Sequence, residues 1–253
     1  MTKAERGIRD ITLSPDSTAR WGRLQQRAYR ALAGRSEWDE SVRALLPADV
    51  AAPFALNVRA RRAVADHAAA SGPSTPSPTL PAWTIVEPLP TEQLLGYYRE
   101  AETATGVPWA YLAAISLMET RMGRIVGASS SGAVGPMQFL PSTWAECCTG
   151  DVTNPHDAIM GAAVYLATLG APADMRKALY GYNPNDGYVG AVDAYARNLL
   201  ADPRAIYGYH AWEVYVTTSA GTLRLPIGYI SSAPQDAATY VAAHRDDLAP
   251  VHD

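Results

Sequence analysis

One helix-forming segment constrains the fold of this chain more than any other feature. Residues 109–118 read Trp-Ala-Tyr-Leu-Ala-Ala-Ile-Ser-Leu-Met and are apolar on nearly every side of a helix. Pro108 precedes the segment, and proline is well suited to the start of a helix. A helix that is apolar all round must be enclosed by other helices. The sequence therefore predicts a mainly α-helical domain built around this segment.

A carboxylate stands at the C-terminal end of that segment. Glu119 would be costly to bury in its ionised form. Desolvation raises the pKa of a carboxyl group, and the negative end of the helix dipole acts in the same direction. A glutamate that keeps its proton near neutral pH can act as a general acid. The alternative for Glu119 is a structural ion pair with Arg121 or Arg124.

Helical patterns surround this segment on both sides. Apolar residues recur at spacings of three and four from Thr91 to about Leu200. Besides 109–118, helices are expected at about 92–103, 142–148, 157–169, 174–181 and 187–200. Three more are expected before them, near 21–32, 38–45 and 55–70, the last with Leu56, Ala60, Ala63 and Val64 facing inward.

The basic run Arg59-Ala60-Arg61-Arg62 lies in the third of the early helices. It is typical either of a contact with an anionic partner or, more commonly, of a solvated helix face.

Composition changes mark the expected domain boundaries. Residues 71–78 consist of Ser, Gly, Pro and Thr, which is linker composition. After residue 206 apolar residues alternate on both sides of Ser219-Ala220-Gly221, which indicates a small β-hairpin. The chain is therefore divided into an N-terminal helical region (1–70), a Ser/Pro-rich linker (71–89), a helical catalytic domain (90–205) and a hairpin tail (206–253).

Composition also excludes several kinds of partner. The formal net charge of the 253 residues is -4, so no basic field would attract nucleic acid. No run of about 18 apolar residues predicts a membrane span. The five histidines are scattered without metal-ligand spacing, so neither a metal nor another cofactor is expected. Residues 1–18 lack the apolar stretch of a secretory signal.

The two cysteines, Cys147 and Cys148, are adjacent. Disulfide geometry fits poorly across one peptide bond, so we expect two small buried residues that are not paired with each other. A different hypothesis makes one of them the nucleophile of a thiol peptidase, together with His156.

Two loops carry side chains suited to a sugar ligand. In the first, Gly132 and Gly135 permit a tight turn, and Gln138 offers both a hydrogen-bond donor and an acceptor. In the second, Tyr182 and Asn183 would present an aromatic ring and an amide. The simpler interpretation is that both segments are ordinary connections between helices.

Taken in order, these motifs resemble those of the soluble lytic transglycosylase family, including its secreted actinobacterial members. Glu119-Thr120 is similar to the family's Glu-Ser, residues 132–138 (Gly-Ala-Val-Gly-Pro-Met-Gln) to Gly-Leu-Met-Gln, and Gly181-Tyr182-Asn183 to Ala-Tyr-Asn. The resemblance covers roughly residues 90–200. Thr120, Pro136 and Pro184-Asn185 depart from the family pattern.

The resemblance implies a lysozyme-like fold, an extracytoplasmic or cell-wall location and a peptidoglycan substrate. It implies cleavage of the β-1,4 bond between N-acetylmuramic acid and N-acetylglucosamine, with a 1,6-anhydro product. Glu119 would act first as acid and then as base. The residues implied to line the glycan groove are Ser129, Met137, Gln138, Tyr182 and Asn183, and Tyr182 would also orient Glu119.

Two alternatives to a transglycosylase stay open. One is a hydrolase on the same fold, which would need a second carboxylate such as Asp151 or Asp186, although both suit turn or cap roles better. The other is a glycan-binding module without turnover.

Overall fold

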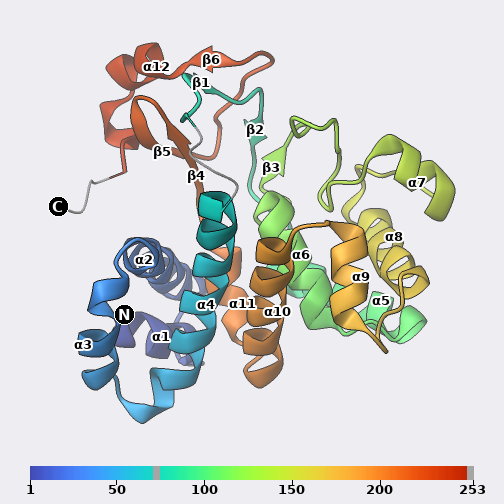
Figure 1. Ribbon diagram of the computed structural model, residues 1–253, viewed down its shortest axis with the longest axis horizontal. Coiled ribbons are helices and arrows are strands. Elements are labelled where there is room, and N and C mark those ends of the chain that lie inside the picture. Colours follow the sequence, from blue (N-terminus) through green and yellow to red (C-terminus); the bar gives the residue numbers. More distant parts are fainter. Residues whose placement is uncertain (71–74, 250–253) are drawn as a thin grey trace.

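The structure is a computed structural model that describes residues 1–70 and 75–249, with the side chains of 66–70 excepted. Residues 71–74, part of the predicted linker, lie outside the described residues. The helices form the larger part of the molecule, and a smaller region with β-strands sits above them in Figure 1. The predicted mainly α-helical, lysozyme-like class is confirmed.

The apolar segment forms helix α6 (Trp109–Thr120) at the centre of the main core. From Ala110 to Leu117 every residue of this helix is buried. Helices α5 (Thr91–Thr105), α8 (Pro155–Thr168) and α10 (Asp186–Ala201) pack against it. The predicted enclosure of this segment by other helices is therefore confirmed.

The remaining predicted helices of this region also form. They are α7 (Pro141–Cys147) and α9 (Met175–Tyr182), and a short helix, α11 (Ala205–His210), follows α10. Side-chain oxygens of Asn154, Asp174 and Asn185 accept backbone N–H groups at the starts of α8, α9 and α10. Such caps satisfy donors that a helix leaves unpaired in its first turn, so they fix where each helix begins.

The N-terminal region contains α1 (Thr2–Arg9), α2 (Pro15–Ala33), the 3-10 turn η1 (Ser36–Trp38), α3 (Asp39–Ala44) and α4 (Ala48–Ala70). Helix α1 was not predicted, and α4 starts earlier than expected, with Pro53 in its second turn. The α4 helix packs along α10, and Ala60 belongs to the main core. The prediction that Val64 faces inward is wrong, since this residue is 43% exposed.

In the described part of the chain, three small antiparallel strand pairs complete the fold. The predicted hairpin forms from β4 (Val214–Thr218) and β5 (Gly221–Leu225). Strand β1 (Thr79–Leu80) pairs with β6 (Gln235–Asp236), and β2 (Thr84–Ile85) pairs with β3 (Ile125–Val126). Helix α12 (Ala237–Ala243) and the turn η2 (Arg245–Asp247) follow β6.

A second hydrophobic core joins segments that are far apart in the sequence. Leu80 and Ile85, which lie in the Ser/Pro-rich segment, pack with Leu223, Leu225 and Tyr229 of the tail. The described part of this segment is therefore built into the tail, above the helices in Figure 1. The division of the chain at residues 70, 89 and 205 stays a prediction.

None of the helices in the described part of the chain is long and apolar enough to cross a bilayer.

Candidate active site

Glu119 is the penultimate residue of α6 and is half-buried. Desolvation by the surrounding protein raises the pKa of its carboxyl group to about 7. Interactions with the Tyr188 hydroxyl and, more weakly, with the charge of Arg121 act in the opposite direction. The carboxyl group therefore keeps its proton near neutral pH and is still within reach of solvent.

The two arginines that could have neutralised Glu119 are engaged elsewhere. Arg121 ends α6 in a left-handed conformation, and its guanidinium donates back to the carbonyl oxygen of Leu117 at 2.5 Å. Arg124 donates to the carbonyl oxygen of His210 and lies 3.7 Å from the carboxylate of Glu87. Glu119 forms no ion pair within 4 Å among the described residues, so a structural ion pair does not account for it.

Tyr188 is the residue of this site that the sequence analysis missed. Its buried hydroxyl faces the Glu119 carboxyl group and makes no close, well-aligned hydrogen bond with the described residues. The side chain of Asn185 accepts the backbone N–H of Tyr188 at 2.8 Å, which fixes the first turn of α10. The sequence offered one indication of it, because Tyr188 is an aromatic residue that directly follows the turn sequence Asn-Pro-Asn-Asp-Gly at 183–187.

Thr120 connects α6 to the glycine-containing loop at 132–138. Its buried hydroxyl donates to the carbonyl oxygen of Pro136 at 2.7 Å and accepts the backbone N–H of Gly123 at 3.0 Å. A β-bridge between Val134 and Phe139 closes the loop. The hydroxyl that threonine shares with the family's serine is therefore the group that anchors the loop.

Two of the predicted ligand-binding side chains, those of Ser129 and Gln138, form hydrogen bonds with backbone groups in and beside the loop. The Ser129 hydroxyl accepts the backbone N–H of Ala133 at 3.1 Å. Gln138 has a positive φ of 51° and donates from its amide nitrogen to the carbonyl oxygens of Gly135 at 3.0 Å and Gly127 at 3.4 Å. Their role in contacting a glycan stays a prediction.

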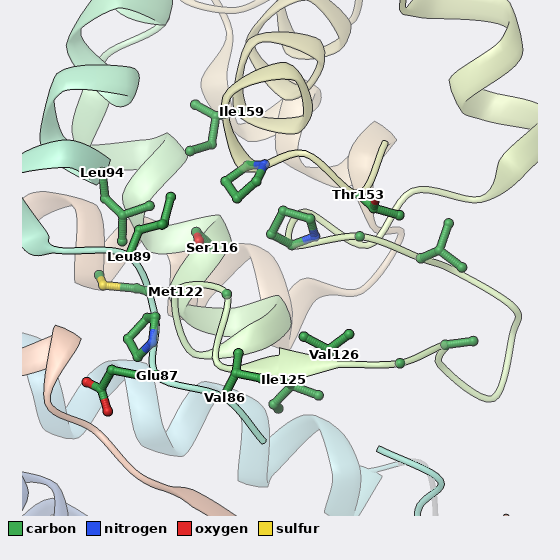
Figure 2. Close-up of a pocket in the computed structure, with 18 residues that line it drawn as sticks. Val86, Glu87, Leu89, Leu94, Ser116, Met122, Ile125, Val126, Thr153 and Ile159 are labelled. Carbon is green, nitrogen blue, oxygen red and sulfur yellow. The ribbon is translucent and has the colours of Figure 1, made fainter. Parts of the chain in front are cut away.

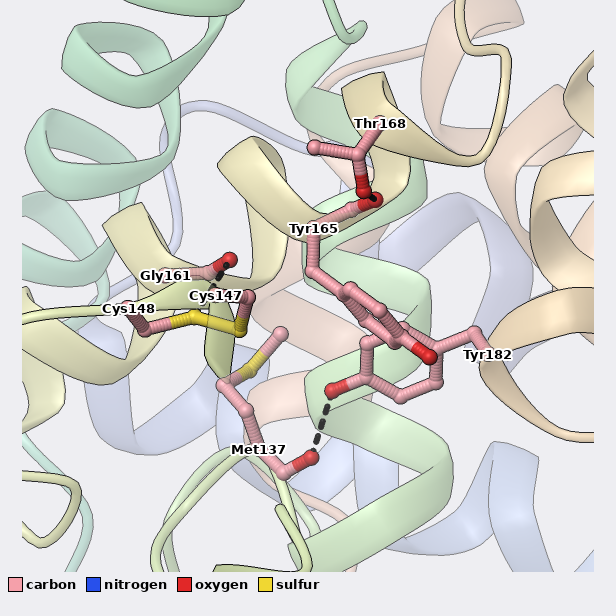
Figure 3. Close-up of a disulfide and its surroundings, with 7 residues drawn as sticks. All are labelled: Met137, Cys147, Cys148, Gly161, Tyr165, Thr168 and Tyr182. Carbon is pink, nitrogen blue, oxygen red and sulfur yellow. Dashed lines mark hydrogen bonds between the residues drawn. A yellow bond between two sulfur atoms is a disulfide. The ribbon is translucent and has the colours of Figure 1, made fainter. Parts of the chain in front are cut away.

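Met137 and Tyr182, both predicted to line the glycan groove, are joined by a hydrogen bond. The Met137 side chain is fully buried, so it cannot line an open groove. Its carbonyl oxygen accepts a hydrogen bond of 2.6 Å from the Tyr182 hydroxyl (Figure 3). That hydroxyl donates its hydrogen to the loop, and the role of Tyr182 in orienting Glu119 stays a prediction. The Tyr182 ring packs near those of Phe139 and Tyr165.

Asn183 lies directly after α9 and is half-buried. Within the described chain its carboxamide makes no hydrogen bond, so the group is available to a ligand. Asn185, one of the departures from the family pattern, is the N-cap of α10. This departure therefore contributes to the start of the helix that carries Tyr188.

The comparisons with known proteins agree with this arrangement. Residues 96–203 match the transglycosylase SLT domain family. These residues form an SLT domain. They contain Glu119, the 132–138 loop and Tyr182-Asn183, so the resemblance inferred from the three motifs is confirmed.

A curated relative is the membrane-bound lytic murein transglycosylase F of Thiobacillus denitrificans (strain ATCC 25259 / T1). It is 30% identical over 117 residues, which are 43% of this chain and 25% of the relative. The chain thus matches about a quarter of the length of that protein. No solved structure gives a significant match to this chain.

The expectation of two unpaired cysteines in the SLT domain is wrong. Cys147 and Cys148 form a disulfide, which Figure 3 shows beside Gly161. The chain leaves α7 between them, since Cys147 ends the helix and Cys148 is extended, with φ -136° and ψ 165°. This change of backbone conformation turns both sulfur atoms to the same side. No described cysteine is free.

The thiol peptidase hypothesis is contradicted by the same disulfide. His156, its proposed base, lies 3.1 Å from the Glu100 carboxylate and packs edge-on against the Tyr97 ring. No sulfur is in the thiol form that a nucleophile would require.

The two aspartates considered as a second carboxylate have other roles in the SLT domain. Asp151 accepts the backbone N–H and the hydroxyl of Thr153, at 2.8 and 2.7 Å, within a turn. Asp186 is exposed and pairs with Arg176 at 2.7 Å. Asp151 therefore has the predicted turn role, whereas Asp186 forms a surface ion pair and the N-cap of α10 is Asn185.

A cavity of about 420 Å³ lies beside the glycine-containing loop at 132–138 (Figure 2). Glu119 is not one of the residues that line it. Its lining is mostly apolar and includes Leu94, Met122, Val126 and Ile159, with Ser116 at its base. Pro136 of the loop also lines it. Pro136 therefore both accepts the hydrogen bond from Thr120 of α6 and forms part of the wall of this apolar cavity.

Proposed function

We propose that this protein is a peptidoglycan lytic transglycosylase in which Glu119 is the single catalytic acid and base. The observation that carries the proposal is the half-buried Glu119 carboxyl group, whose pKa is raised to about 7 by desolvation. The SLT domain and the name of the murein transglycosylase relative support the reaction and the substrate class. The substrate in turn supports action outside the cytoplasm.

The proposed reaction begins with proton donation. Glu119 protonates the oxygen of the β-1,4 bond that links N-acetylmuramic acid to N-acetylglucosamine, and this bond breaks. The muramoyl acetamido group assists at the anomeric carbon, in place of a carboxylate nucleophile. The ionised Glu119 then removes the proton from the muramoyl C6 hydroxyl, whose oxygen bonds to the anomeric carbon as the bond between that carbon and the acetamido oxygen breaks. The product is a 1,6-anhydro sugar, and Glu119 regains its proton.

The surrounding residues have two proposed roles. Ser129, Gln138 and Asn183 face the glycan, and Asn183 supports this most directly because its carboxamide is half-exposed and makes no hydrogen bond within the described chain. Tyr182 and Tyr188 act on the protein itself. The Tyr182 hydroxyl joins α9 to the loop through the Met137 carbonyl, and Tyr188 positions the carboxyl group of Glu119.

Mass analysis of the products released from purified peptidoglycan tests this proposal. We expect muropeptides with anhydro ends, each one water lighter than the product of hydrolysis. Release of reducing ends alone would replace the proposal with a hydrolase, and binding without release would replace it with a glycan-binding module. Incubation with Glu119→Gln protein is the control, and it should release neither product at a comparable rate.

A further inference from the structure

A second cavity, of about 240 Å³, is lined by three arginines that are far apart in the sequence. Arg23 comes from α2, Arg124 from the position directly before β3, and Arg224 from β5 of the hairpin. Glu119 is not one of the lining residues, so this cavity is not the proposed active site. It lies where an N-terminal helix, the SLT domain and the tail meet.

Arg124 is buried in the wall of this cavity but is only partly hydrogen-bonded. Its side chain is 7% exposed, and its guanidinium donates to the carbonyl oxygen of His210 at 3.0 Å. The Glu87 carboxylate is 67% exposed and lies 3.7 Å from Arg124, beyond hydrogen-bond distance. The buried Nε of Arg124 has no acceptor within the described part of the chain. A buried donor without an acceptor is costly, so the cavity calls for an acceptor that these residues do not supply.

Arg23 faces the same cavity and is half-buried. With the residues that the structure describes, it forms neither an ion pair nor a hydrogen bond. Burial lowers the pKa of Arg124, and the positive charge of Arg23 acts in the same direction, against the carboxylates of Glu87 and Glu213. Arg23 and Arg124 therefore both have donors that are free to bind a ligand.

The third arginine is already paired. Arg224 lies 3.5 Å from the Glu213 carboxylate and 3.3 Å from that of Asp247. Glu87 and Glu213 also line the cavity, so three arginines stand against two glutamates and the lining keeps one excess positive charge. This charge favours an anionic ligand.

The rest of the lining is mostly apolar. Besides His210 it consists of Ala19, Ala211, Val214, Leu225, Pro226 and Ile227. An inorganic anion would leave this apolar surface uncovered. An organic acid with a short apolar group would contact both kinds of wall.

We propose that this cavity binds a carboxylate attached to a small apolar group, either a free organic acid or the C-terminal end of a peptide that ends in a residue such as alanine. Arg23 and Arg124 bind the carboxylate, because the planar guanidinium group matches it with parallel hydrogen bonds. The apolar walls contact the attached group. The site goes beyond the proposed cleavage reaction and does not depend on it.

NMR titration of the full chain tests the site with four probes. Propionate represents a free organic acid and N-acetyl-alanyl-alanine a peptide end, while the amide of the same dipeptide is uncharged and phosphate is inorganic. Arg23→Gln is compared with Arg20→Gln, a control at an exposed position of the same helix that does not line the cavity. Circular dichroism checks the fold of each variant.

We expect a carboxylate probe to bind the wild type at least tenfold more tightly than the amide or phosphate, and to shift the Arg124 Nε–H resonance. Arg23→Gln should weaken this binding by about 10- to 100-fold, the size of a lost charge-assisted contact, and Arg20→Gln should leave it unchanged. Tighter binding of the dipeptide assigns a peptide end, and tighter binding of propionate assigns a free acid. Equal binding of the two assigns the chemistry that they share.

Four results would overturn the inference: no binding of either carboxylate, equal binding of the dipeptide and its amide, phosphate binding as tight as that of the carboxylates, or unchanged affinity in Arg23→Gln. Should Arg23→Gln fail to fold, the wild type alone decides. Its Arg124 Nε–H resonance should move with the carboxylates and stay in place with the amide, and any other pattern contradicts the site.

Discussion

The Thr120 hydroxyl donates a hydrogen bond of 2.7 Å to the carbonyl oxygen of Pro136, and so joins the end of α6 to the glycine-containing loop. The hydroxyl oxygen of Thr120 also accepts the backbone N–H of Gly123. In Thr120→Val both backbone groups lose a buried partner. We expect a loss of about 1–3 kcal/mol in the free energy of unfolding, measured by urea denaturation, together with reduced cleavage of peptidoglycan.

Thr120→Ser is the matched control, because it keeps the hydroxyl and removes only a methyl group. It should retain most of the activity. Equal losses of activity in Thr120→Val and Thr120→Ser would mean that the methyl group, and not the hydrogen bonds, matters at this position.

Glu119→Gln keeps the size and polarity of the side chain but cannot transfer the catalytic proton. General acid–base catalysis contributes about 10²–10⁴-fold, and a residue that performs both steps should lie at the upper end of this range. We expect kcat to fall by that factor, with the fold preserved by circular dichroism.

Asp186→Asn is the companion variant, since Asp186 is an exposed carboxylate paired with Arg176. Its activity should stay close to that of the wild type, and its stability should change by no more than about 1 kcal/mol. A large loss of activity in Asp186→Asn, together with normal turnover by Glu119→Gln, would mean that Asp186 and not Glu119 is the catalytic acid.

The pKa of Glu119, about 7, predicts the alkaline limb of the pH–rate profile. In the proposed reaction the acid form is the reactive one, so kcat/KM should fall as the pH rises through 7, approaching about tenfold per pH unit. Tyr188 lowers this pKa, so Tyr188→Phe should move the alkaline limb to higher pH. An unchanged limb in Tyr188→Phe would show that the hydroxyl does not act on the carboxyl group.

The same pKa predicts how stability depends on pH. The folded protein binds a proton at Glu119 more tightly than the unfolded chain, whose glutamates titrate near 4.5. The contribution of this residue to the free energy of unfolding should therefore fall as the pH rises from about 4.5 to 7. Denaturant midpoints of the wild type and Glu119→Gln, compared across this range, measure the difference. A difference of the opposite sign would mean that Glu119 is stabilised in its ionised form.

Two glycines in the loop have similar backbone angles but different surroundings. Gly132 has φ 81° with open space where a Cβ would lie, whereas a Cβ on Gly135, with φ 77°, would lie 2.0 Å from the carbonyl oxygen of Val152. Alanine at either position costs about 1–2 kcal/mol in backbone strain. Gly135→Ala should lose about 1–3 kcal/mol more, with reduced activity, as measured by urea denaturation and product release. Equal effects would contradict the close approach to Val152.

Local patterns were enough to predict the helical frame and the desolvated carboxyl group of Glu119. A segment that is apolar all round has few solutions other than enclosure, and α6 with Glu119 at its end follows from that. Helix α1 could not be found in the same way. It is a short polar segment, and its stability depends on Glu5, which is buried and accepts hydrogen bonds from Gln25 and Tyr29 of α2. A contact between distant side chains of this kind leaves no local pattern.

The structure shows contacts of the predicted binding residues that the sequence does not reveal. The motifs indicated that Met137 and Tyr182 belong to one site, yet the contact between them runs through a backbone carbonyl, which a sequence does not reveal. The disulfide was missed for a related reason, because pairing of Cys147 with Cys148 depends on the change of backbone conformation at the end of α7.

The pairing of β1 with β6 has a consequence for synthesis of the chain on the ribosome. Thr79 pairs with Asp236, so its partner is made 157 residues later. Domains fold as they emerge, N-terminal parts first, and contacts between distant positions form slowly. The α-helices around α6 can therefore assemble while Leu80 and Ile85 still lack their partners in the second core. The upper region in Figure 1 closes last, once the C-terminal tail has left the ribosome.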